Sequence, residues 1–172
     1  MKVIKTVMAG SVAMALVSFS ANAANPGGQG EVVFKGTVVN APCGIAAGNE
    51  GAAVEVDFGQ VSKEKLEDSF EQKDFSIKLT NCDTEHLTNG VSLTFGGATT
   101  QSTELPTAGG TGTAIVLSGY GKDITFGTAT DYIQLVDGDN ELAFSAKLKK
   151  ANGEAISEGA FNATSTFSLN YQ

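Results

Sequence analysis

The stretch that decides the fold is Gly159-Ala160-Phe161-Asn162-Ala163-Thr164-Ser165-Thr166-Phe167-Ser168-Leu169-Asn170-Tyr171-Gln172. From Phe161 onward the odd positions carry apolar or small residues, whereas the even positions are all polar. A period of two over this length predicts a β-strand with one buried face. We expect the strand to continue to Gln172, so that its backbone edge and terminal carboxylate are available to another protein.

The beginning of the sequence has the features of a secretory signal peptide. Lys2 and Lys5 precede an uncharged, mostly apolar stretch at residues 7–19, and Ala21-Asn22-Ala23 fits a cleavage site of small residues. This stretch is shorter than the about 20 residues needed to cross a bilayer. We therefore expect residues 1–23 to be removed, the mature chain to begin at Ala24, and the protein to be exported without inserting into a membrane.

The charge of the chain argues against polyanionic partners. The sequence has 11 lysines, no arginine and 19 acidic residues, and its formal net charge is −8. Without Lys2 and Lys5 the charge becomes −10. A surface this acidic repels phosphate backbones and anionic lipids, so we expect no binding to nucleic acid. A basic protein partner would suit it.

Cys43 and Cys82 are the only cysteines of the sequence. In an exported chain, two cysteines predict one disulfide bond. A metal site would need further ligands, and His86 is the single histidine. We expect the disulfide to close a loop of roughly 40 residues and to raise the free energy of the unfolded state by about 4 kcal/mol in the chain-entropy model.

Short runs typical of strands recur along residues 31–172, separated by turns rich in Gly, Asn and Asp. They lie at residues 31–39, 53–58, 75–82, 91–95, 114–117, 124–126, 132–136, 141–148 and 161–172. Residues 61–69 have the one helical pattern, which is short enough to be a connector. This arrangement predicts an all-β protein built as an antiparallel sandwich.

Several motifs resemble landmarks of pilins assembled by the chaperone–usher route. The C-terminal stretch matches in its glycine fourteenth from the end, its alternation and its penultimate tyrosine. The others are Asn40-Ala41-Pro42-Cys43, Asp57-Phe58-Gly59-Gln60, Leu79-Thr80-Asn81-Cys82-Asp83 and Gly109-Gly110-Thr111-Gly112-Thr113. The resemblance covers nearly the whole mature chain. Within the family, the chain is most similar to the rod-forming major subunit of P-type pili.

The resemblance implies an incomplete immunoglobulin-like sandwich that lacks its last strand and so has a hydrophobic groove. A periplasmic chaperone would fill this groove first, and the N-terminal extension of another subunit would replace it in the fibre. The implied partners are identical or homologous pilin subunits, the chaperone and an outer-membrane usher. The implied location is the cell surface, and residues 36–172 would form the pilin domain.

Residues 24–35 are the expected donor extension, and their alternation favours one register. The even positions Pro26, Gly28, Gly30, Val32 and Phe34 carry no charge, whereas Gln29 and Glu31 lie in the odd set. Burying Glu31 unpaired would cost several kcal/mol, so we expect the even positions to face the groove. The resemblance implies one glycine at a tight point, for which Gly28 is the first choice and Gly30 the second. The alternative is a disordered glycine-rich tail.

The C-terminal strand is the other expected binding element. The resemblance implies that its apolar side chains align against a chaperone strand by β-augmentation, and that a basic pair on the chaperone holds the carboxylate of Gln172. The residues concerned are Gly159, Phe161, Ala163, Phe167, Leu169, Tyr171 and Gln172. The alternative is that this C-terminal strand packs only within the core of its own subunit.

Catalytic motifs are scarce, and we expect neither enzymatic activity nor a cofactor. His86 is expected in an exposed loop, and the run from Asp137 to Asn140 lacks the spacing and later glutamate of a calcium loop. Two other functions remain open. The chain could be a minor adaptor or terminator pilin, or it could be a self-complete secreted sandwich that binds a carbohydrate or a protein.

Overall fold

The computed structural model describes residues 30–99 and 101–172, and residues 38–172 form one compact unit in it. The predicted signal peptide at residues 1–23 lies outside the described residues, as do Pro26 and Gly28 of the expected donor extension. No helix among the described residues is long and apolar enough to span a membrane.

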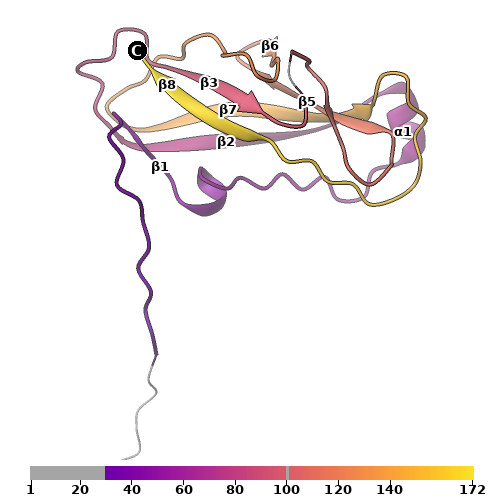
Figure 1. Ribbon diagram of the computed structural model, residues 1–172, viewed down its shortest axis with the longest axis horizontal. Coiled ribbons are helices and arrows are strands. Elements are labelled where there is room, and N and C mark those ends of the chain that lie inside the picture. Colours follow the sequence, from indigo (N-terminus) through magenta and orange to yellow (C-terminus); the bar gives the residue numbers. More distant parts are fainter. Residues whose placement is uncertain (1–29, 100) are drawn as a thin grey trace, which may run out of the picture. The chain divides into compact units, whose positions relative to one another are not determined.

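The compact unit is nearly all β, as predicted, and every strand pairing in it is antiparallel (Figure 1). The strands are β1 (Gly44–Ile45), β2 (Glu71–Cys82), β3 (Val91–Gly96), β4 (Leu105–Pro106), β5 (Thr113–Gly119), β6 (Lys122–Asp123), β7 (Gly138–Lys150) and β8 (Thr166–Tyr171). The two short helices are the 3-10 turn Gly48–Glu50 and α1 (Lys63–Asp68), which confirms the connector helix expected at residues 61–69.

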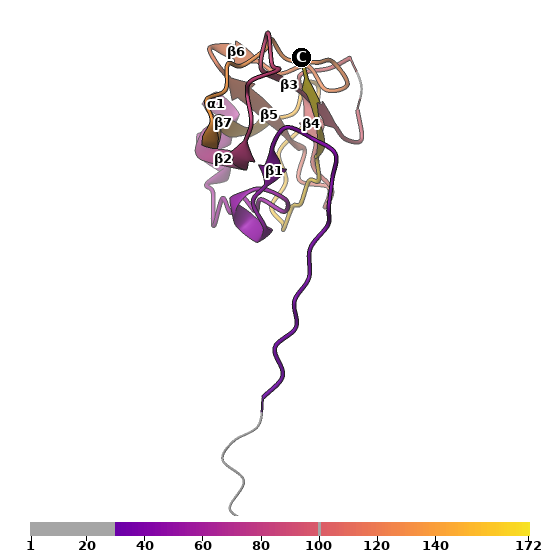
Figure 2. The same cartoon turned by 90° about the vertical axis from the view of Figure 1, so that its left-hand side faces the viewer.

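Within the described residues the strands form two sheets. The six-stranded sheet has the order β1-β2-β7-β5-β4, with β6 also paired to β5, and the two-stranded sheet joins β3 to β8. The second view shows the strands of the compact unit nearly end-on (Figure 2). The long β2–β7 ladder runs from the pair Glu71–Leu148 to the pair Leu79–Asn140 and shifts register before Cys82.

The core lies between the inward faces of these strands. Its most completely buried side chains are Phe126, Ile77, Leu79, Leu93, Leu142, Leu148 and Val91. All of these except Phe126 are aliphatic residues at alternate positions of β2, β3 and β7, as the period of two predicts. Phe144 links the aromatic residues, because its ring contacts those of Phe75, Phe95 and Tyr120.

Four runs that the sequence predicts as strands differ in the structure. Residues 31–39 form no strand, residues 53–58 are extended but unpaired, and residues 124–126 and 132–136 lie outside the named strands. The predicted C-terminal strand is also shorter, because pairing with β3 begins only at Thr166. Alternation indicates which side chains are buried, whereas a strand also needs a paired neighbour. Among the described residues, 31–39 and 53–58 have no neighbouring strand, and 124–126 and 132–136 have only isolated backbone hydrogen bonds, such as the bridge between Ile133 and Val91.

The expected disulfide joins Cys43 to Cys82, whose Cα atoms are 4.1 Å apart. The strand pair beside it, Gly44 with Thr80, brings the two cysteines together. The bond fastens the first residues of the compact unit to β2 and closes a loop with a sequence separation of 39 residues.

Cys43→Ser is expected to lower the free energy of unfolding by about 4 kcal/mol, because the unfolded chain regains the entropy of the open loop. Urea denaturation of oxidised wild type and variant measures this difference. Cys82→Ser should give the same loss. Equal midpoints for wild type and variants, or free thiols in the oxidised wild type, would contradict the assignment.

Glu104 connects the segment before β4 to the end of β7. Its carboxylate accepts hydrogen bonds from Lys149 Nζ and, at 3.2 Å, from the backbone N–H of Asn152. Burial raises the pKa of the Glu104 carboxyl, but the hydrogen bonds from Lys149 and Asn152 outweigh burial, so the pKa lies below its usual value of 4.5. The ionised form is therefore favoured by folding.

A group with a depressed folded-state pKa contributes stability above its unfolded pKa and loses it as the pH falls through the folded value. We expect the free energy of unfolding of wild type to fall below pH 4.5 more steeply than that of Glu104→Gln. Urea melts between pH 7 and pH 3 measure both slopes. Glu141→Gln, at an exposed position of β7, is the control and should follow wild type. Identical slopes for Glu104→Gln and wild type would refute the coupling.

Candidate functional site: an apolar groove between two unpaired backbone edges

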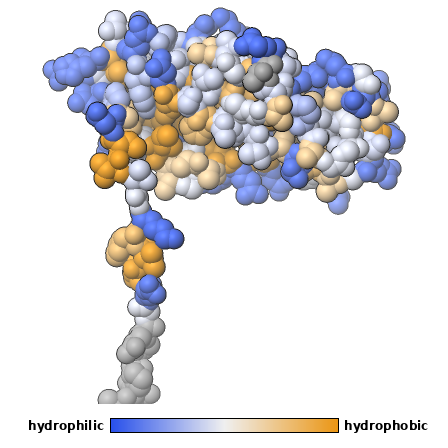
Figure 3. Space-filling view, viewed as in Figure 1, coloured by the Kyte–Doolittle hydropathy of each residue, from blue (hydrophilic) through white to orange (hydrophobic). Residues whose placement is uncertain are grey.

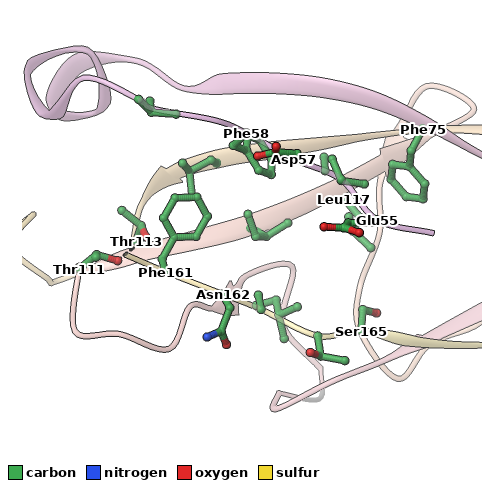
Figure 4. A pocket seen from close by; sticks show the side chains of 18 of the residues that line it. Glu55, Asp57, Phe58, Phe75, Thr111, Thr113, Leu117, Phe161, Asn162 and Ser165 are labelled. Carbon is green, nitrogen blue, oxygen red and sulfur yellow. Dashed lines mark hydrogen bonds between the residues drawn. The ribbon is translucent and has the colours of Figure 1, made fainter. Parts of the chain in front are cut away.

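A groove of about 1640 Å³ opens on the compact unit. Its floor consists of inward-facing side chains from five strands and is mainly apolar: Phe75 and Ile77 of β2, Phe95 of β3, Leu105 of β4, Ile115 and Leu117 of β5, and Ala146 and Leu148 of β7. Figure 4 shows Phe75 and Leu117 in this groove. These side chains belong to the same core that the strands build elsewhere, so the groove is a part of the core that lacks a cover.

Two segments border the groove. We call residues 52–61 the first rim. Residues 156–167 line the groove on the other side, and we call them, together with the rest of β8 up to Tyr171, the second rim. In the first rim Val54, Val56 and Phe58 are half-buried, whereas Glu55 and Asp57 between them are exposed. This is the alternation of a strand with one face on the core. Yet none of these residues belongs to a sheet.

The backbone of the first rim is open on one side. Among the described residues, the N–H groups of Val54, Val56 and Phe58 have no hydrogen-bond partner, whereas Glu55 and Gly59 donate to side chains close in sequence. Exposed backbone groups of this kind are a template for another strand.

The second rim has a complementary open edge. Gly90 and Gln172 exchange both backbone hydrogen bonds, at 3.0 Å each. Because hydrogen-bonded pairs alternate along an antiparallel ladder, the N–H and C=O groups of Phe167, Leu169 and Tyr171 point away from β3. No described residue pairs with that side of β8. The same three residues have half-buried side chains that pack against the core.

The other expected residues of the C-terminal stretch also lie along the second rim. Gly159 and Phe161 line the groove, as does Ala163, which is exposed although the alternation predicts an inward position. The hydroxyl of Tyr171 is buried without a partner among the described residues, and burial raises the pKa of this phenol. Gln172 is exposed and continues the ladder with Gly90.

The described part of the expected donor extension carries exposed apolar side chains. Val32 is 74% exposed and Phe34 is 89% exposed, while a side chain added at Gly30 would meet no atom within 4 Å. Figure 3 shows this apolar cluster, in orange, between hydrophilic residues of the extended segment. Val33, in the odd register, is 62% exposed, so exposure alone does not choose the register.

Among residues 30–99 and 101–172, no three His, Cys, Asp or Glu side chains come together as a possible metal site. His86 is exposed in the loop after β2, as predicted from the sequence. The sequence predicts an ordinary paired strand at residues 53–58. The structure instead places these residues along the groove, outside the named strands, which alternation alone does not reveal.

An apolar groove between two open backbone edges defines a sandwich that needs one more strand from elsewhere. Comparison with known proteins gives the family: residues 32–172 match the model of the fimbrial protein family. KS71A fimbrillin of Escherichia coli is 48% identical over 188 aligned positions, covering 98% of this chain and all of the relative. The Pap fimbrial major pilin protein of Escherichia coli is 46% identical, with the same coverage.

Solved structures agree with this assignment. A chaperone–usher pilus structure has a TM-score of 0.78 and 43% identity, covering 86% of this chain and 98% of the matched chain. The P pilus rod subunit PapA has a TM-score of 0.69 and 40% identity, covering 77% of this chain and all of PapA. The chain belongs to the fimbrial protein family, and its fold is the immunoglobulin-like sandwich of pilus subunits that lacks a strand.

Proposed function

We propose that this protein is the structural subunit of a bacterial surface fimbria and that it polymerises into the fimbrial rod by donor-strand exchange. The observation that carries the proposal is the groove, whose apolar floor lies between two backbone edges without partners. A strand inserted there would pair with both rims and cover the floor in one step. The exposed apolar surface and open edges, which promote aggregation, would then be removed together.

The occupant in the fibre is the N-terminal extension, residues 24–35, of a neighbouring copy. This extension offers uncharged residues at its even positions, and Val32 and Phe34 among them are exposed. The pilin domain then comprises residues 36–172. Because groove and extension are different surfaces of one chain, the contact is head-to-tail and propagates into an open fibre instead of closing as a dimer.

Before assembly, a periplasmic chaperone occupies the groove, and an outer-membrane usher exports the subunit after signal-peptide removal. Support comes from the open edge of Phe167, Leu169 and Tyr171, which suits β-augmentation by a chaperone strand. The similarity to a subunit of a solved chaperone–usher pilus supports the same route. The chain is a structural subunit and not an enzyme. Its likeness to major pilins favours the rod over the adaptor or terminator role.

Val32→Asp is expected to stop fibre growth, because the inserted strand would bury an unpaired carboxylate in the apolar groove. Val33→Asp is the matched control, since the neighbouring side chain would face outward and fibres should form. Electron microscopy of cells expressing each variant, with immunoblots of subunit levels, distinguishes assembly from folding. Long fibres from Val32→Asp together with none from Val33→Asp would reverse the register. Long fibres from both variants would overturn the donor assignment.

Fusing a second copy of residues 24–39 after Gln172 through a short flexible linker should give a soluble monomer that does not polymerise. The added strand covers the groove intramolecularly, so the fusion should melt well above the unfused chain. A fusion whose added segment carries Val32→Asp is the control for the extra residues. Equal melting temperatures with and without the native segment would favour the self-complete sandwich and would refute the proposal.

A further inference from the structure

Two Asn-Gly pairs occur in the sequence, Asn89-Gly90 and Asn152-Gly153. The first directly precedes β3, and the second lies in the turn after β7. Asparagine is one of the thermolabile residues of proteins, because the backbone nitrogen of the next residue attacks its side-chain amide. Glycine in that next position favours the attack, since it has no Cβ and its backbone rotates freely. The two pairs are therefore candidate sites of one spontaneous reaction.

The peptide unit between Asn89 and Gly90 is held at both of its polar groups. The N–H of Gly90 donates a 3.0 Å hydrogen bond to the backbone oxygen of Gln172, and the C=O of Asn89 accepts a 3.2 Å hydrogen bond from Gln134 Nε2. Gly90 is buried, and a Cβ added there would meet the carbonyl oxygen of Ile133 at 2.0 Å. Attack on the side chain requires this peptide unit to rotate, which would break both hydrogen bonds.

The peptide unit between Asn152 and Gly153 is held at neither group. Both residues are exposed, in a turn closed by a 3.2 Å hydrogen bond from the N–H of Glu154 to the C=O of Ala151. The φ of Gly153 is +80°, a conformation that suits glycine at this position of a turn. Among the described residues, the C=O of Asn152 and the N–H of Gly153 have no hydrogen-bond partner. A Cβ built at Gly153 would meet no atom within 4 Å.

We propose that Asn152 is a site of spontaneous deamidation and that the fold protects Asn89 from the same reaction. The nitrogen of Gly153 bonds to Cγ of Asn152 and gives up its proton, while the bond between Cγ and the side-chain nitrogen breaks and ammonia leaves. Water then opens the five-membered cyclic imide at one of its two carbonyl groups, which yields aspartate or isoaspartate. The reaction needs no enzyme, oxidant or cofactor, and the inference does not depend on the function proposed for the groove.

The modification would act on the contact that Glu104 makes with this turn. The backbone N–H of Asn152 donates to Glu104 Oε2 at 3.2 Å, and the same carboxylate accepts a hydrogen bond from Lys149. Either product adds a negative charge near that carboxylate. In isoaspartate the new carboxylate lies on the carbon next to the donating N–H. Repulsion between the like charges should weaken the link between the segment before β4 and the end of β7.

The test follows both asparagines in one sample. Purified protein is incubated at neutral pH, either folded or unfolded in urea, and is then digested at acidic pH. Mass spectrometry with chromatographic separation of the peptides measures aspartate and isoaspartate at positions 89 and 152. In the folded protein Asn152 should convert at least about tenfold faster than Asn89, because Asn89 reacts only after local opening. In urea the two rates should be similar, since both sites are then free.

Two variants complete the test. Asn152→Gln keeps the amide and should form no isoaspartate during the same incubation. Asn152→Asp imitates one product and should lower the melting temperature by about 1–3 °C, and this loss should shrink in the background of Glu104→Gln. Equal rates at Asn89 and Asn152 in the folded protein would overturn the proposal. So would conversion of Asn152 only in urea, or conversion to aspartate without isoaspartate. An unchanged melting temperature of Asn152→Asp would overturn the coupling to Glu104.

Discussion

The free edge of β8 is the constraint on which the rest of the structure depends. In an antiparallel ladder, alternate residues direct their backbone groups to opposite sides, and β3 satisfies only one side of β8. Phe167, Leu169 and Tyr171 therefore combine open backbone groups with apolar side chains that face the core. An added strand would pair with these open backbone groups and cover the apolar side chains at the same time. The fold therefore favours a partner through its hydrogen bonds as well as through its apolar surface.

The first rim indicates where the missing strand would lie. Residues 54–58 already have the side-chain alternation of a strand, and Val54, Val56 and Phe58 pack partly on the core. The missing strand would therefore pair on both sides instead of extending a sheet on one. A strand paired on both sides has partners for all of its backbone N–H and C=O groups. This is the physical difference between a completed sandwich and an ordinary contact between strand edges.

Outside the groove, a disulfide bond and side-chain hydrogen bonds join distant segments of the compact unit and stabilise it although one strand is missing. The Cys43–Cys82 bridge fastens the start of the unit to β2, and Glu104 joins the approach to β4 to the end of β7. Further ion pairs, such as Lys150 with Glu67, connect α1 to the sheet at exposed positions, where each contributes little by itself. The subunit is thus built so that its incomplete part is confined to one groove.

The sequence by itself determined which faces of the main strands are buried and, through its motifs, the class of protein. Its period of two correctly indicated the core faces of β2, β3, β7 and β8, and the two cysteines of an exported chain indicated the disulfide. It could not determine which backbone edges are paired. Residues 53–58 and residues 161–165 alternate as well as the true strands do, yet the first has no neighbour and the second forms a single bridge. The alternation of apolar side chains can be seen within a segment's own sequence. The pairing of its backbone depends on which other segment lies alongside, and only the tertiary structure decides that.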